Sequence, residues 1–191
     1  MPKLAFAICI VFALDSARLQ SERIEARPTG ATIFAYHVDD PERYGVIAFD
    51  RQGQAISIEE KPAKPKSSWA VTGLYFYDAD IVAIAKTEKR SARNEYEITD
   101  VNRAYLERGD LHVQRRGRGF AWLDTGTPDS LTDASNFVRT LEKRRGTRIC
   151  CPEEVAFEKG YIDAARLAVL AKVLGKNPYG RYLRRIVDER G

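Results

Sequence analysis

The sequence predicts an α/β fold in which a mixed sheet containing a β-hairpin precedes a helical C-terminal region. Strand and helix patterns alternate up to about residue 126, and only helix patterns follow. Two apolar runs flank the Gly-containing segment 50–53, which is typical of a hairpin. The 191 residues are 44% hydrophobic and 30% charged, a globular balance that excludes a disordered, collagen-like or coiled-coil chain.

The first element is an apolar run, residues 4–14. It is too short to span a membrane, which takes about 20 residues. A continuous apolar run is typical of a buried central strand in a parallel sheet. The residues around the run also weakly resemble a secretory signal, so both interpretations stay open, with the strand favoured. Residues 16–27 predict a short polar helix that ends at Pro28.

The next segments predict most of the sheet. Residues 31–38 form a β-branched and aromatic strand. Residues 44–49 and 55–60 form the hairpin, the segment 61–68 is a loop with two prolines and three lysines, and residues 69–77 form another apolar strand. Two further short strands, 111–115 and 120–123, flank a basic turn.

Helix signals interrupt and then follow the strands. Asp78 is expected to cap a helix whose buried stripe is Ile81, Val82, Ile84 and Ala85. The segment 94–97 resembles a capping box, with Glu97 at the third position of a helix that ends at Gly109.

The C-terminal region predicts four helices. The first starts at Thr127-Pro128, the second runs from Pro152 to near Gly160, Asp163 caps the third and Asn177-Pro178 starts the last. The apolar faces of the first and last helices are expected to be Leu131, Ala134, Val138 and Leu141, and Tyr179, Tyr182, Leu183 and Ile186. We therefore divide the chain into residues 1–28, 29–126 and 127–191.

Charge and cysteine content narrow the function. The net charge is only +4, which gives little support to nucleic-acid binding. The arginines at 115, 116 and 118 fit a solvated turn better than a nucleic-acid surface. Three cysteines, two of them adjacent, do not make a disulfide framework and favour a reducing cytosol. With two histidines in the chain, a His-rich metal site is excluded.

Three clusters could carry chemistry. Glu60 and Lys61 end a strand, where a carboxylate could accept hydroxyl hydrogens and an ammonium could hold phosphate. Strand alternation places Glu60 opposite to Glu59 and Lys61. Gly45 after Tyr44 permits close approach of a ligand, and Asp124 before a helix could hold Mg²⁺. From spacing alone, a solvated strand end, an ordinary strand entry and a helix-capping Asp remain open for the three clusters.

Taken together and in this order, the clusters are more specific. The segments YGVIAFD (44–50), SIEEKPAKPKSSWAVTGLYFYD (57–78), EITDVNRAYLERG (97–109) and FAWLDTGTPDSL (120–131) resemble the C-terminal part of the glucose-1-phosphate thymidylyltransferases. This resemblance implies an incomplete Rossmann-like nucleotidyltransferase sheet plus a helical region. It implies the reaction of dTTP with glucose 1-phosphate to give dTDP-glucose and pyrophosphate, in dTDP-rhamnose and polysaccharide biosynthesis.

The resemblance also implies a site and its partners. Lys61 and Asp124 would be catalytic, with Asp124 also a ligand of Mg²⁺. The substrate-binding residues would be Tyr44, Gly45, Glu60, Lys61, Val71, Tyr75 and Arg93. The family implies a cytoplasmic homotetramer with no membrane or nucleic-acid partner.

One part of the family pattern is absent from the sequence. The family carries a Gly-rich loop that cradles the triphosphate, whereas the first glycine here is Gly30. Asp15 lacks the neighbours of the family's other metal ligand, and we do not assign it. We expect residues 1–28 to come from a shortened or shifted start, and the chain alone to be weakly active or inactive. The alternative is a non-catalytic fragment that binds sugar phosphate or associates with an intact homologue.

Overall fold

The computed structural model describes residues 4–7, 10–13, 29–117 and 119–190. The chain divides into two compact units, Met1–Thr127 and Pro128–Gly191. Each unit has its own buried core.

The first unit is built on a mixed sheet with the strand order β5-β4-β6-β3-β7, in which β1 also pairs with β6. The strands are β3 (Ala31–His37), β4 (Gly45–Phe49), β5 (Ala55–Glu60), β6 (Trp69–Tyr77) and β7 (Leu111–Arg115). The pair β3–β7 is parallel, and the other pairs of this sheet are antiparallel. The predicted α/β class, mixed sheet and hairpin are confirmed.

The N-terminal apolar run differs from the prediction. It forms two strands, β1 (Leu4–Ala7) and β2 (Ile10–Ala13), and both pair antiparallel, β1 with β6 and β2 with β8 (Phe120–Leu123). The prediction of one strand in a parallel sheet is therefore wrong. An apolar run encodes burial but not the direction or number of its pairings. The helix predicted at 16–27 lies outside the described residues.

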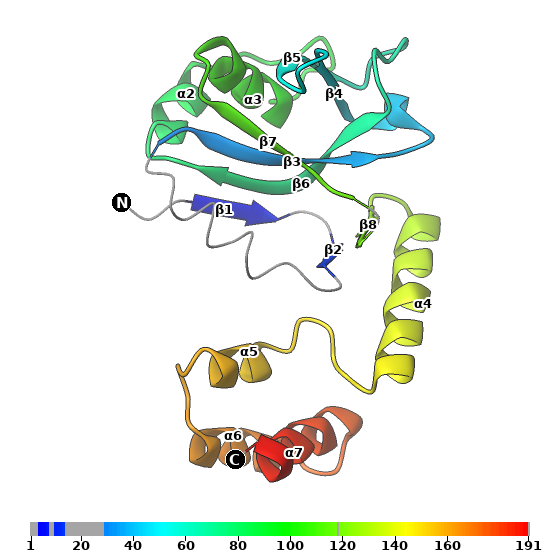
Figure 1. Ribbon diagram of the computed structural model, residues 1–191, viewed down its shortest axis with the longest axis vertical. Helices are drawn as coiled ribbons and strands as arrows, with labels where there is room; N and C mark the ends of the chain where they lie inside the picture. The colour runs from blue at the N-terminus through cyan, green and yellow to red at the C-terminus, as the bar shows by residue number, and fades with distance from the viewer. Residues whose placement is uncertain (1–3, 8–9, 14–28, 118, 191) are drawn as a thin grey trace. The chain divides into compact units, whose positions relative to one another are not determined.

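Two helices, α2 (Ile81–Thr87) and α3 (Ile98–Glu107), cover one face of this sheet (Figure 1). Period-2 alternation turns one set of sheet residues toward them, including Ile33, Ile47 and Ile58, and these pack with Val101 and Tyr105. Burying this set gives the first unit its core.

The predicted helix starts need correction. The N-cap of α2, which begins at Ile81, is Asp80 rather than Asp78. The Asp78 carboxylate accepts from the Asp80 N–H and also from the Gly30 N–H. In α2, Ile81 is buried, but Val82 is 52% exposed and Ala85 is exposed as well, so the predicted stripe is wrong at those two positions. Glu97 is the N-cap of α3 rather than its third residue, and its carboxylate accepts from Ser91 and Arg93. Local side-chain partners thus replace the predicted capping box.

The second unit is helical, as predicted: α4 (Pro128–Arg145), α5 (Pro152–Glu158), α6 (Ala164–Val173) and α7 (Pro178–Arg190). Asp163 caps α6 by accepting from the Arg166 N–H at 2.7 Å. The core joins Cys151, Leu167, Ala171, Tyr182, Leu183 and Ile186. Of the apolar face predicted for α4, Ala134 is buried but Leu131 is 52% exposed. None of the helices in the described part of the chain is long and apolar enough to cross a membrane.

Candidate functional site

A cavity of about 560 Å³ opens in the first unit at the end of the hairpin. Its walls come from β4, β5, β6, the start of α3 and the segment after β8. Seven residues singled out from the sequence line it: Tyr44, Gly45, Glu60, Lys61, Val71, Tyr75 and Asp124. Five further residues complete the lining: Arg43, Ile98, Thr99, Gly126 and Thr127. The structure therefore brings together side chains from positions 43 to 127.

The hairpin places Glu60 and Lys61 at the same cavity. Glu60 is the last residue of β5 and lies opposite Gly45 of β4. The Lys61 N–H then donates to the Tyr44 carbonyl at 3.0 Å, and Lys61 has a left-handed backbone with φ of 42°. The prediction that Lys61 faces away from Glu60 is wrong because strand alternation ends there. A non-glycine residue in this region is strained, and such strain often occurs at functional sites.

Glu60 is held from α3. The Thr99 hydroxyl donates to Oε2 of Glu60 at 2.5 Å, and Nη2 of Arg93 lies 3.4 Å from Oε1. The Glu60 side chain is 21% exposed, so the carboxylate remains accessible from the cavity. A carboxylate fixed in this way can accept hydrogen bonds from ligand hydroxyls.

Arg93, the remaining predicted binding residue, does not line the cavity. Its guanidinium contacts the carboxylates of Glu60, Glu95 and Glu97. Hydrogen bonds from Arg93 and Ser91 hold the pKa of Glu97 below its usual value. In this structure Arg93 is thus tied to carboxylates, and its predicted contact with phosphate stays a prediction.

Tyr44 lines one side of the cavity, and its ring packs against Trp122 and Arg43. The rings of Tyr44 and Trp122 meet edge to face with centroids 4.9 Å apart, and the Arg43 guanidinium lies 5.3 Å from the centre of the Tyr44 ring. Burial, with the nearby Asp40 charge, raises the pKa of Tyr44. The phenol therefore stays protonated at neutral pH and can donate. Val71 and Tyr75 are buried and add an apolar surface.

Asp124 lies across the cavity, after β8. Its Oδ1 accepts from the Gly126 N–H at 3.3 Å, and its Oδ2 is 3.5 Å from Nη2 of Arg43. Both interpretations left open from the sequence thus have some geometric basis, because the carboxylate contacts a backbone amide and also lines the cavity. Within the described residues, no group of three His, Cys, Asp or Glu side chains could hold a metal. Mg²⁺ needs only one or two carboxylates when substrate phosphates complete its shell, so Asp124 fits that role. Asp15 lies outside the described residues.

Sequence reasoning missed Thr99 and Arg43. Thr99 lies in the EITD segment that resembles the family, but its place in a predicted helix does not indicate a contact with Glu60. Arg43 stands next to Tyr44, in the short 3-10 helix Pro41–Arg43. The available signal for Thr99 was its position as a polar residue at the start of a helix that reaches a cavity.

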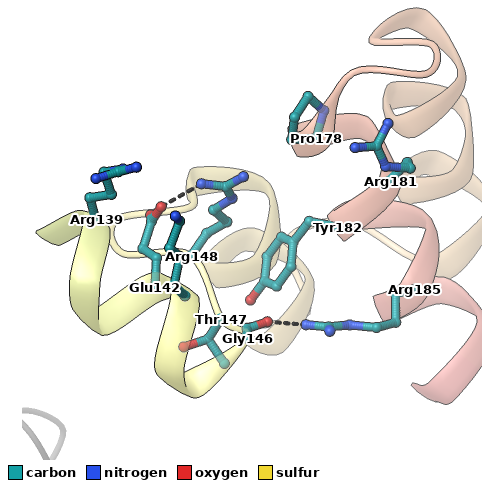
Figure 2. Close-up of a pocket in the computed structure, with 10 residues that line it drawn as sticks. Arg139, Glu142, Gly146, Thr147, Arg148, Pro178, Arg181, Tyr182 and Arg185 are labelled. Atoms are coloured by element: carbon teal, nitrogen blue, oxygen red, sulfur yellow. Dashed lines mark hydrogen bonds and ion pairs between the residues drawn. The ribbon is translucent and has the colours of Figure 1, made fainter.

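A second cavity, of about 620 Å³, lies in the helical unit and contains none of the predicted site residues (Figure 2). It is basic, with one acidic residue, Glu142, among its lining cations: Arg139, Lys143, Arg148, Arg181 and Arg185. Glu142 pairs with Arg148, and Arg185 donates to the Gly146 carbonyl. Two of these cations, Arg148 and Arg185, thus already have partners within the unit.

Comparison with known proteins places these features in context. A sequence model of the family described as nucleotidyl transferase matches residues 11–140. The glucose-1-phosphate thymidylyltransferase of Xanthomonas campestris pv. campestris (strain B100) is 57% identical over 161 residues, which is 84% of this chain and 55% of that protein. The enzyme of the same name from Mycolicibacterium smegmatis is 56% identical over 84% of this chain and 56% of its own length.

A solved structure shows the same relationship. A Bacillus anthracis protein, described as a glucose-1-phosphate thymidylyltransferase in complex with a sucrose, matches with a TM-score of 0.59 and 42% identity. The match covers 68% of this chain and 51% of that one. The chain thus spans about half the length of the curated relatives it matches.

Proposed function

The chain belongs to the nucleotidyl transferase family and is similar to glucose-1-phosphate thymidylyltransferases, and on this basis we propose that its cavity binds the sugar phosphate of that reaction. In the proposed reaction, a phosphate oxygen of glucose 1-phosphate forms a bond to the α-phosphorus of dTTP. The bond from that phosphorus to the departing pyrophosphate breaks, and dTDP-glucose is formed for dTDP-rhamnose and polysaccharide biosynthesis.

The observation that carries this proposal is the pairing of Glu60 and Lys61 at one cavity. Glu60 is an acceptor for sugar hydroxyls, and Lys61 supplies a point charge for the phosphate. A sugar phosphate needs both groups a few ångströms apart, because its hydroxyls and its phosphate belong to one small molecule. Because the left-handed backbone of Lys61 ends the strand alternation, the side chains of Glu60 and Lys61 both reach this cavity.

The other residues would orient the ligand. Tyr44 and Gly45 would line one side of the sugar, and Val71 and Tyr75 the opposite, apolar side. Arg93 would bind phosphate after exchanging its contact with Glu60 for one with the ligand. Holding the phosphate oxygen in line with the attacked phosphorus is the main catalytic contribution that such a site can make.

We propose Mg²⁺ as the cofactor, held by Asp124 and the substrate phosphates. The bound ion would offset phosphate charge. In the structure the Arg43 guanidinium lies beside Asp124, 3.5 Å from the carboxylate. Arg43 would stay in the cavity as a second positive charge for the phosphate groups.

The triphosphate side of the reaction differs from the family pattern. The sequence has no glycine before Gly30, whereas the family resemblance implies a Gly-rich loop that cradles the triphosphate. We therefore expect the 191-residue chain alone to bind glucose 1-phosphate but to turn over slowly or not at all. The alternative is a non-catalytic fragment that binds sugar phosphate or associates with an intact homologue. The proposed substrates and the free thiols of Cys150 and Cys151 fit a cytoplasmic protein.

Calorimetric titration of the purified chain with glucose 1-phosphate tests the proposal. We expect binding by the wild type and a loss of at least tenfold in Glu60→Gln and Lys61→Met. Glu59→Gln is the matched control, because Glu59 lies on the other side of β5 and pairs with Lys66. The absence of wild-type binding, or equal losses in the control, would contradict the proposal.

Pyrophosphate release with dTTP, glucose 1-phosphate and Mg²⁺ then separates the enzyme from the binding subunit. Release that disappears in Asp124→Asn would support catalysis by this chain. Binding without release would support the non-catalytic alternative.

A further inference from the structure

We propose that Thr99 is the positioning residue for Glu60: its hydroxyl fixes the orientation in which the Glu60 carboxylate meets the sugar. The inference rests on the proposed function, in which Glu60 accepts hydrogen bonds from the ligand. It concerns a contact between α3 and β5 that the sequence pattern did not suggest.

The geometry of this contact is tight. Thr99 is the second residue of α3 and is 2% exposed, so its side chain has little freedom to move. Its hydroxyl donates to Oε2 of Glu60 at 2.5 Å. Gly45, on β4, lies close to the same bond: a Cβ added to it would lie 3.0 Å from Oγ1 of Thr99 and 3.3 Å from Oε2 of Glu60. Three elements thus converge on one carboxylate oxygen.

The contact from Arg93 does not restrain Glu60 as the contact from Thr99 does. Arg93 reaches Oε1 only at 3.4 Å, its side chain is 40% exposed, and the same Nη2 also contacts Glu95 and Glu97. The shortest contact of this guanidinium, 2.8 Å, is with Glu97, so its longer and exposed contact restrains Glu60 only weakly. The bond from Thr99 is therefore the restraint that selects one rotamer of Glu60.

The two oxygens of the Glu60 carboxylate therefore have different roles. With Oε2 held by Thr99, Oε1 keeps a free direction toward the cavity and can accept from a ligand hydroxyl. Glu60 has three side-chain torsions, and restraining them before binding lowers the entropy that ligand binding must remove. The N-terminus of α3 also presents the positive end of its dipole to this carboxylate.

Substitutions at Thr99 test the inference by calorimetric titration with glucose 1-phosphate. Thr99→Val keeps the size of the side chain and removes the hydroxyl, and we expect affinity to fall about tenfold. Thr99→Ser keeps the hydroxyl and should stay within about threefold of the wild type. Thr72→Val is the matched control, because Thr72 is 1% exposed and its hydroxyl has no hydrogen-bond partner among the described residues.

A double-mutant cycle shows whether Thr99 acts through Glu60. Once Glu60→Gln has removed the charged acceptor, adding Thr99→Val should weaken binding by less than twofold. Additive losses would overturn the inference, as would equal losses in Thr99→Ser and Thr99→Val. Thermal unfolding of each variant establishes that the comparison is made on folded protein.

Failure of the proposed function has a different signature. If the wild type does not bind glucose 1-phosphate, that function is wrong, and the Thr99 contact is then judged in the free protein. The ¹³C resonance of the Glu60 carboxyl should move in Thr99→Val and stay in place in Thr99→Ser. An unmoved resonance in Thr99→Val would overturn the positioning role.

Discussion

Gly45 and Glu60 lie directly opposite each other across the β4–β5 hairpin, and the glycine leaves the space that the Glu60 carboxylate fills. A Cβ at position 45 would meet Oε2 of Glu60 at 3.3 Å and Oγ1 of Thr99 at 3.0 Å. Because Gly45 has no side chain, the Glu60 carboxylate can take this position in the cavity.

We predict that Gly45→Ala weakens glucose 1-phosphate binding about tenfold, because the new methyl group displaces Glu60 from its bond with Thr99 and overpacking forces side chains from their preferred rotamers. Isothermal titration measures the effect. The control is Gly117→Ala, where a Cβ would meet nothing within 4 Å. Unchanged affinity in Gly45→Ala would show that Glu60 tolerates a shifted position.

At position 61, stability should depend on the backbone conformation, whereas phosphate binding should depend on the ammonium group. Lys61 has φ of 42°, a conformation that costs a non-glycine residue about 1 kcal/mol. We expect Lys61→Gly to be more stable than Lys61→Ala by about that amount, while both lose phosphate affinity equally. Urea unfolding and calorimetry on the two variants make the comparison. A Lys61→Gly protein less stable than Lys61→Ala would contradict it.

The hairpin shows how far the sequence could predict this site. A turn signal at 50–53 between two apolar runs predicts the hairpin itself. Gly45 lies opposite Glu60 only because the pairing register shifts between Ala48 and Phe49, and the sequence carries no signal for that shift. The left-handed backbone of Lys61 could not be predicted in this way, because lysine carries no local signal for it. The contact from Thr99 likewise depends on how α3 packs against β5, a tertiary arrangement that period and propensity do not encode.

Arg116 is the clearest case in which local pattern misled. Its position in a basic, glycine-rich turn predicts a solvated side chain, yet Arg116 is 8% exposed. Its guanidinium lies 3.9 Å from the Phe34 ring centre and 4.5 Å from that of Phe120. Its Nε and Nη1 have no hydrogen-bond partner among the described residues. Burial lowers the pKa of Arg116 to about 10.

We predict that Arg116→Leu stabilises the first unit by about 1–3 kcal/mol, because replacing a buried, incompletely paired charge by an apolar side chain removes a desolvation cost. The difference in stability between Arg116→Leu and the wild type should decrease above pH 10, because Arg116 of the folded wild type loses its charge there. Both tryptophans, Trp69 and Trp122, lie in this unit, so their fluorescence follows its unfolding. Arg115→Leu is the exposed control. A lower melting temperature in Arg116→Leu would mean that the aromatic contacts outweigh the cost.

In the helical unit, the charge of Glu142 should contribute to stability. It accepts from Arg148 and from the Ile149 N–H at 3.1 Å, and its side chain is 18% exposed (Figure 2). We expect Glu142→Gln to cost about 1–2 kcal/mol, since it weakens a charge-assisted pair and leaves neighbouring cations unbalanced. Far-UV circular dichroism should show the loss while tryptophan fluorescence is unchanged. Glu189→Gln, at an exposed pair with Arg185, is the control.

The last prediction concerns Asp78, which joins three parts of the first unit. Its carboxylate accepts from the Gly30 N–H at 2.6 Å, the Tyr105 hydroxyl at 2.7 Å and the Asp80 N–H at 3.1 Å. Burial opposes ionisation, but these three hydrogen bonds together hold the pKa of Asp78 below its usual value.

A depressed folded-state pKa stabilises the protein only while the carboxylate is ionised. The contribution of Asp78 is therefore complete well above about pH 4, the ordinary aspartate value, and is lost as the pH falls through the lower folded pKa. We expect Asp78→Asn to cost about 2 kcal/mol at pH 7 and much less at pH 2. Urea unfolding followed by tryptophan fluorescence across this range measures the difference. Asp80→Asn keeps the backbone donor and should leave the profile unchanged, whereas a pH-independent cost in Asp78→Asn would show that shape, not charge, is what Asp78 supplies.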